Sequence, residues 1–180
     1  MIRTIVVGTD GSAHGQRAVT WTAELASQLG AKVVLVHVAP PVQAPMAAAG
    51  GYVMYVPQDV IDETRAALEE QVRDEFGAPL TAAGVAWQGL LLEGSPPIVL
   101  REVAAEVGAQ VIVVGTRALH TLGELFLGST SHALTRHRGV PVIVVPLAAE
   151  PVDAWSFIAG RAPTVRPFTP TNSAGYSPPY

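Results

Sequence analysis

The hydrophobic residues of this chain are grouped into short apolar runs, separated by stretches in which apolar residues mostly recur with helical spacing. A short run rich in valine and isoleucine is typical of a strand buried on both faces of a parallel sheet. Apolar residues three or four apart, with polar residues between them, are typical of an amphipathic helix. The pattern predicts strands at 2–8, 32–38, 85–92, 111–114 and 141–145, and helices at 14–29, 59–83, 96–107 and 130–137.

The regular alternation of these elements predicts an α/β fold, with an open, five-stranded, mostly parallel sheet and helices on both faces. Between the second strand and the second helix, prolines and the Gly50-Gly51 pair predict a long loop at 39–57. That loop either helps to shape a ligand site or is a surface insertion without a role. Pro79 weakens the last turns of the second helix, whose apolar face consists of Ile61, Leu68, Val72 and Phe76.

The composition of the chain narrows the range of folds and functions. With 180 residues, 49% of them hydrophobic, the chain can fill one core, so we predict a single domain over residues 1–147. Residues 148–180 are rich in proline, serine and threonine, which predicts a disordered tail. The net charge of −4, without a cluster of basic residues, argues against a nucleic-acid partner. There is no cysteine, and no apolar run is long enough for a signal peptide or a membrane span, so we expect a cytoplasmic protein.

The stretch 111–131 has the order of elements found in phosphate-binding sites. Its strand ends at Gly115, which we expect to turn the backbone sharply off the strand. The first amides of a helix lack internal partners and carry partial positive charge, so an anion can bind there without a lysine or arginine. After a loop, such a helix is predicted to begin, with a hydroxyl cap, around Gly128, Ser129, Thr130 and Ser131.

The spacing of residues in this stretch is more specific than a generic turn. Gly115, two residues, Ala118, nine residues and then Gly128-Ser129 resembles the G-x2-G-x9-G-[ST] nucleotide motif of the universal stress protein family. Alanine replaces the second glycine of that motif. The resemblance extends from residue 2 to about residue 146 and includes the closing VPVIVVP.

The resemblance implies a strand order of three, two, one, four, five. In that order the winding reverses between strands one and four, and ligands bind at the reversal, beyond the carboxyl ends of the strands. In the family, an aspartate at the Asp10 position binds the ribose, and the Val38 position contacts adenine. The candidate nucleotide-binding residues are therefore Gly8, Thr9, Asp10, Val38, Gly115, Arg117, Ala118, Gly128, Ser129, Thr130 and Ser131.

Several of these residues have a simpler interpretation as well. Asp10 can cap the turn or the first helix, and Ser129 can be an ordinary helix cap. Arg117 either contacts a phosphate or is exposed to solvent. If the motif needs a positive φ at position 118, Ala118 costs about 1 kcal/mol; if it needs only close approach, one methyl group is tolerated.

Three functional hypotheses follow. The first is a module that binds ATP, with or without Mg²⁺, or else AMP or cyclic AMP, and has at most slow hydrolysis. The second is a non-nucleotide member of the same family that acts as an interaction protein, which Ala118 favours. The third is a nucleotide-activating enzyme, but the sequence after the first strand, Gly8 to Ser12, lacks the expected S-G-G-x-D-S loop. We predict no metal site, since the histidines lie in separate segments or at spacings that a helix does not align. We also predict no catalytic residues, since the sequence has neither the G-x-S-x-G motif of serine hydrolases around Ser129 or Ser131 nor the G-x-x-x-x-G-K-[ST] motif of motor-type NTPases.

The last predicted strand also suggests a partner. An edge strand this apolar is an aggregation hazard unless another chain covers it. Members of the family pair this edge across a two-fold axis, which implies a homodimer. The residues of that interface would be Val140, Val142, Ile143, Val144 and Val145.

Overall fold

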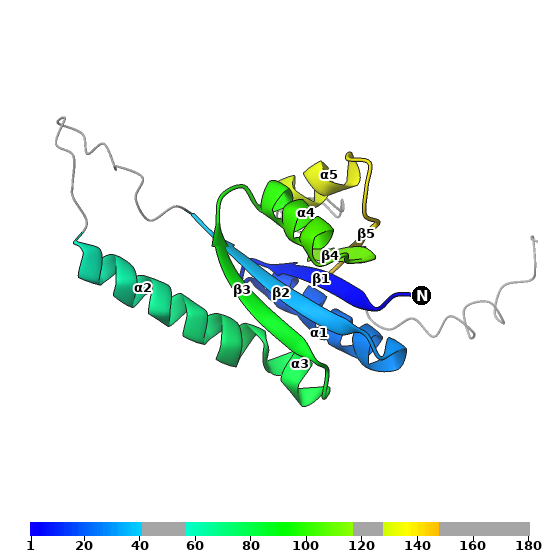
Figure 1. Ribbon diagram of the computed structural model, residues 1–180, viewed down its shortest axis with the longest axis horizontal. Helices are drawn as coiled ribbons and strands as arrows, with labels where there is room; N and C mark the ends of the chain where they lie inside the picture. Colours follow the sequence, from blue (N-terminus) through cyan, green and yellow to red (C-terminus); the bar gives the residue numbers. More distant parts are fainter. Residues whose placement is uncertain (41–56, 117–127, 148–180) are drawn as a thin grey trace, which may run out of the picture. The chain divides into compact units, whose positions relative to one another are not determined.

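The computed structural model describes residues 1–40, 57–116 and 128–147 (Figure 1). Met1–Leu147 form one compact unit. None of the helices in the described ranges has the length and apolarity needed to cross a bilayer. The strands are β1 Thr4–Thr9, β2 Lys32–Ala39, β3 Trp87–Glu93, β4 Val111–Gly115 and β5 Val142–Val145. The helices are α1 Ala13–Leu29, α2 Gln58–Gln71, α3 Ala78–Ala82, α4 Pro96–Glu106 and α5 Ser129–Thr135, with a π-helix, η1, at Val72–Phe76.

The strands form one parallel sheet in the order β3-β2-β1-β4-β5. This confirms the predicted fold and strand order. The central strands have uninterrupted apolar sequences because both of their faces are covered: Val6, Val7 and Val113 are completely buried. From β1 the chain winds outward in one direction through β2 and β3, then returns to β4 and continues to β5. The carboxyl ends of β1 and β4 therefore flank the point at which the winding reverses.

Helices cover the two faces of the sheet (Figure 1). α1, η1 and α3 pack on one face, where Val19, Phe76 and Leu80 are buried. α4 and α5 pack on the other face, around Leu100 and Leu134. Right-handed crossovers require this division, because the direction of winding differs on the two sides of the reversal.

The predicted helix 59–83 is wrong as a single element, because the structure divides it into α2, η1 and α3. No residue of α2 is buried, so Ile61 and Leu68 are only half-buried, whereas Val72 and Phe76 of η1 reach the core. The π-helix closes with a hydrogen bond from the Gly77 amide to the Val72 carbonyl, 3.0 Å long. Its wider turn changes the direction of the chain, and α3 then begins with Pro79 in its first turn, where a missing N–H costs nothing.

The strand predicted at 85–92 begins two residues later and ends one residue later in the structure. The Val85 amide donates to the Leu80 carbonyl at 3.1 Å, which closes the turn after α3 and leaves β3 to begin at Trp87. The loop predicted at 39–57 falls mainly on residues 41–56, and the predicted tail on 148–180, which lie outside the described residues. The same holds for 117–127, which include Arg117 and Ala118.

Candidate functional site

The turn after β1 holds Asp10 in a defined orientation. The Oδ1 atom of Asp10 accepts hydrogen bonds from the Ser12 amide at 3.1 Å and from the Ser12 hydroxyl at 2.5 Å. The Ser12 hydroxyl in turn accepts from the Gly15 amide at 3.3 Å and caps α1. Asp10 thus has the turn-capping role that sequence reasoning weighed against a ligand role. A carboxylate has two oxygens that accept several hydrogen bonds, so Asp10 can cap the turn and also accept hydrogen bonds from a ligand in the pocket.

The end of β4 lies directly against the first turn of α1. A Cβ atom on Gly115 would be 2.3 Å from the His14 carbonyl oxygen and 3.2 Å from the Gly15 nitrogen. The expectation that Gly115 turns the backbone sharply off the strand stays a prediction, because residues 117–127 lie outside the described residues; Gly115 itself does not have a positive φ. It is needed because the two backbones approach too closely for any side chain. On the same side, Thr116 Oγ1 lies 3.4 Å from His14 Nδ1.

The start of α5 differs from the prediction in its cap. The N-cap residue is Gly128, with φ −57° and ψ 160°, so no hydroxyl side chain caps the helix. Gly128 contributes its carbonyl instead, which accepts from the His132 amide at 2.9 Å and from the Ser131 hydroxyl at 3.0 Å. As at any helix N-terminus, the amides of the first turn have no backbone carbonyl one turn earlier that could accept their hydrogen bonds. They belong to Ser129, Thr130 and Ser131, next to Gly128.

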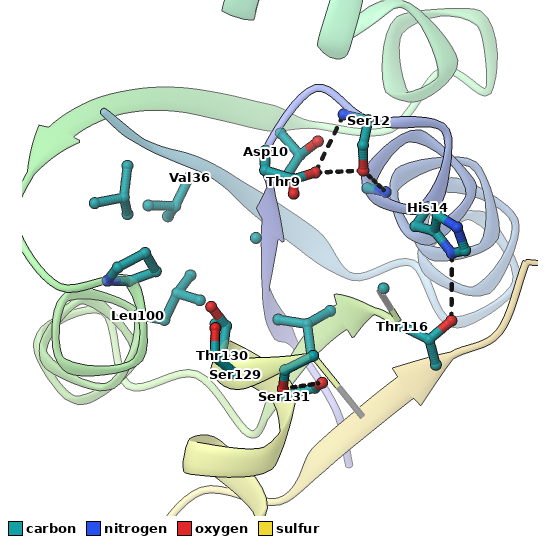
Figure 2. Close-up of a pocket in the computed structure, with 17 residues that line it drawn as sticks. Thr9, Asp10, Ser12, His14, Val36, Leu100, Thr116, Ser129, Thr130 and Ser131 are labelled. Atoms are coloured by element: carbon teal, nitrogen blue, oxygen red, sulfur yellow. Dashed lines mark hydrogen bonds between the residues drawn. The ribbon is translucent and has the colours of Figure 1, made fainter. Parts of the chain in front are cut away.

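These segments surround one pocket at the reversal of the sheet (Figure 2). Asp10 and Ser12 lie on one side of it, and Ser129 and Thr130 come from α5 on the other. All the candidate residues that lie within the described ranges line it; Arg117 and Ala118 lie outside those ranges. The lining residues predicted from the sequence are Gly8, Thr9, Asp10, Val38, Gly115, Gly128, Ser129, Thr130 and Ser131.

Sequence reasoning did not name several other lining residues as part of the site. Val36 was recoverable, because the period of two along a strand places it on the same face as Val38. Pro96 and Leu100 were not, because only the packing of α4 over the carboxyl end of β1 brings them to the pocket. The residues not assigned to the site beforehand are Ser12, His14, Gly15, Val36, Pro96, Leu100, Val114 and Thr116.

The pocket divides into two chemically different parts. Val36, Val38 and Leu100 form an apolar wall, while the turn after β1 and the start of α5 contribute hydroxyls and amides. Among the described lining residues, Asp10 is the one carboxylate and no lysine or arginine occurs. Such a pocket can hold a flat apolar group against the wall, a hydroxylated group near Asp10 and an anion at the helix start.

Comparison with known proteins identifies the family. The family model for the universal stress protein family matches residues 1–146. This chain belongs to the universal stress protein family. The resemblance inferred from the Gly115 to Ser129 spacing is therefore confirmed, and it extends over the whole of the α/β unit.

Relatives and solved structures of the universal stress protein family cover most of the chain. A universal stress protein of Thermus aquaticus is 32% identical over 146 residues, which is 81% of this chain and 99% of the relative. Another, of Mycolicibacterium smegmatis, is 34% identical over 78% of this chain, but only 47% of that longer relative is matched. Among solved structures, a universal stress protein in complex with cAMP is 27% identical and has a TM-score of 0.61, covering 82% of this chain and 98% of the other.

Proposed function

We propose that this chain is a regulatory module that binds an adenine nucleotide, preferably ATP, in the pocket between β1 and β4. The observation that carries the proposal is that Asp10 and the first turn of α5 line the same pocket, at the point where the winding of the sheet reverses. A carboxylate for ribose hydroxyls and bare amides for phosphates are the two groups that a nucleotide requires. The cAMP complex of a universal stress protein that is 27% identical supports an adenine ligand.

The proposed arrangement assigns one part of the ligand to each part of the pocket. The adenine ring would lie against Val36, Val38 and Leu100, because a flat apolar ring gains most from leaving water there. The ribose hydroxyls would donate to Asp10. The phosphates would accept from the amides at the start of α5, where the helix dipole adds partial positive charge.

Calorimetric titration of the full chain with ATP, AMP and cAMP, each with and without Mg²⁺, tests this function. We expect ATP to bind with a Kd in the micromolar range, equivalent to about 8 kcal/mol. ATP at 100 times its Kd should then raise the free energy of unfolding by about 2.7 kcal/mol. The absence of both heat and a thermal shift with all three nucleotides would refute the proposal.

We propose binding without catalytic turnover, or at most slow hydrolysis. An enzyme that transfers a phosphoryl or nucleotidyl group needs groups that stabilise the negative charge on the oxygens of the transferred group. Lysine, arginine or a bound metal ion usually supplies this stabilisation. The described lining residues offer amides and hydroxyls for this purpose. An assay for released phosphate, pyrophosphate and AMP tests the point, and sustained release at several turnovers per minute would contradict it.

The second candidate function is an interaction protein that binds no nucleotide. The observation in its favour is Ala118, which stands where the nucleotide motif has glycine. If Ala118 prevents binding, the wild-type chain should give no titration heat with ATP, and the Ala118→Gly variant should acquire binding. If the wild type binds and Ala118→Gly tightens binding by about fivefold, corresponding to a relieved strain of about 1 kcal/mol, the first function holds.

We also propose that two copies associate through β5. Within the described residues β5 pairs with β4 alone, and Val142, Ile143 and Val144 are only half-buried. An apolar edge strand left open would attract another chain, so pairing with a second copy is a way to cover it.

A further inference from the structure

The π-helix η1 touches the Asp10 turn from the face of the sheet opposite the apolar wall of the pocket. Val36 and Val38 line the pocket, and His37, which lies between them on β2, points to the other face. There its ring meets Phe76 of η1, with ring centroids 5.4 Å apart and the planes tilted by 50°. π-Helical turns are rare and often occur near functional sites. This π-helix ends at Phe76, which is in contact with the turn after β1.

Phe76 packs directly on Gly11, the residue after Asp10. A Cβ atom on Gly11 would lie 2.7 Å from Cζ of Phe76, so the ring edge occupies the space that a side chain would need. Gly11 has φ +76°, a left-handed conformation that favours glycine. The Gly11 amide donates to Thr9 Oγ1 at 3.1 Å. The ring therefore rests against the residue at which the turn takes its left-handed conformation.

His37 holds the residue on the other side of Asp10. Its Nδ1 lies 3.0 Å from the Thr9 carbonyl oxygen. Since a carbonyl oxygen only accepts, Nδ1 is the protonated nitrogen in this contact. Phe76 and His37 thus contact each other, and each also contacts a residue adjacent to Asp10. A further contact joins η1 to α1, from the Gln16 side-chain amide to the Glu75 carbonyl at 3.4 Å.

We propose that Phe76 and His37 are positioning residues for the nucleotide site, which hold Asp10 in the orientation that a ribose requires. They act through Thr9 and Gly11 and do not touch the ligand. This inference rests on the proposed nucleotide binding. It assigns a function to the π-helix, whose last residue, Phe76, is buried and packs on Gly11 in the turn after β1.

Calorimetry on full-length variants tests the inference, with ATP as the probe. His37→Val removes the hydrogen bond, and His37→Asn keeps a donor near the Nδ1 position. We expect Phe76→Leu and His37→Val to weaken ATP binding about fivefold to tenfold, and His37→Asn to restore affinity to within about threefold of wild type. The matched control is Val72→Ala, a buried residue of the same π-helix that packs against Gly89 of β3. It should lower the melting temperature and leave the ATP affinity unchanged.

A second readout separates this inference from the proposed function. Amide hydrogen exchange at Gly11 and Ser12 reports the turn itself, since both amides are hydrogen-bonded within it. Exchange at these amides should accelerate in Phe76→Leu and His37→Val, but not in Val72→Ala. If wild type binds no nucleotide and exchange still follows this pattern, the proposed function fails while the support of the turn stands. If Val72→Ala changes affinity or exchange as much as Phe76→Leu does, or if neither variant changes them, the positioning role is refuted.

Discussion

At the scale of single residues, Asp10 has a role both in the structure of the turn after β1 and in the proposed binding of the ribose. Asp10 Oδ1 already accepts two hydrogen bonds from Ser12, so the carboxylate is held before any ligand arrives. A group whose orientation is fixed in advance loses less conformational entropy on binding. The turn-capping and ligand-binding interpretations of Asp10 are thus compatible, and variants can separate them.

Asp10→Asn should affect ligand binding more than stability. The amide keeps an acceptor for the Ser12 amide but loses the charge that strengthens hydrogen bonds from ribose hydroxyls. We expect ATP affinity to fall by about tenfold or more and the free energy of unfolding to change by under about 1 kcal/mol. Titration calorimetry and urea denaturation measure the two effects. Glu24→Gln, an exposed carboxylate on α1, is the control and should change neither.

Gly115→Ala tests the close approach of β4 and α1. Because the new methyl group would lie 2.3 Å from the His14 carbonyl, the two backbones must separate. We expect a loss of about 1–3 kcal/mol in the free energy of unfolding, the usual range for overpacking. Gly30→Ala is a useful comparison, since Gly30 has φ +62° and no atom within 4 Å of its Cβ position. It should cost only about 1 kcal/mol of backbone strain, so equal losses would argue against the clash.

At the scale of elements, α2 and α3 show that helical periodicity does not by itself determine burial. Both come from one predicted helix, yet no residue of α2 is buried and Leu80 of α3 is completely buried. α2 is also tied to the end of β3 by the exposed ion pair between Arg65 and Glu93, at 2.9 Å. An exposed pair of this kind contributes little. Of the three elements α2, η1 and α3, we therefore expect η1 and α3 to contribute most of the stability.

A matched pair of leucine substitutions checks this distribution. Leu80→Ala removes a fully buried side chain and should lower the free energy of unfolding by about 2–5 kcal/mol. Leu68→Ala makes the same chemical change at a half-buried position of the mostly exposed α2 and should cost under about 1 kcal/mol. Denaturant unfolding of both variants supplies the comparison. Similar losses would mean that α2 is packed against a surface in solution, such as a partner.

At the scale of the whole molecule, the two edges of the sheet differ. β5 consists of apolar residues alone, most of them half-buried, whereas β3 combines the half-buried Leu90, Leu91 and Leu92 with the exposed polar residues Gln88 and Glu93. Apolar edges attract other chains and polar edges resist them. The proposed homodimer therefore belongs to the β5 edge.

Ile143→Lys should disrupt that dimer. A charge in the middle of the paired edge would be buried without a partner, so sedimentation should show monomer or aggregate in place of dimer. Gln88→Lys places the same charge on the opposite edge and should leave the dimer intact. A dimer that persists in Ile143→Lys would point to another interface.

The fold was largely predictable, and the site was predictable in part. The buried apolar runs located the strands because a strand covered on both faces excludes polar residues along its whole length. The Gly128 to Ser131 segment was found because phosphate sites need glycine and hydroxyl residues at a helix start. Asp10 was assigned to the site through the resemblance to the family, since the residues alone are equally compatible with a turn cap. Leu100 and Pro96 carry no such signature. Both are ordinary helix residues in the sequence, and only the packing of α4 over the end of β1 brings them to the pocket.

The sequence by itself determined the five strands, three of the four predicted helices and their order along the chain, because hydrophobic periodicity and turn residues act over a few neighbouring positions. It also determined the family, through the spacing that follows Gly115. Only the tertiary structure decided where the π-helix interrupts the second predicted helix and why Gly115 must lack a side chain. It alone decided that Phe76 supports the Asp10 turn. These features depend on atoms that are distant in the chain and meet only when the layers pack, so no local pattern can encode them.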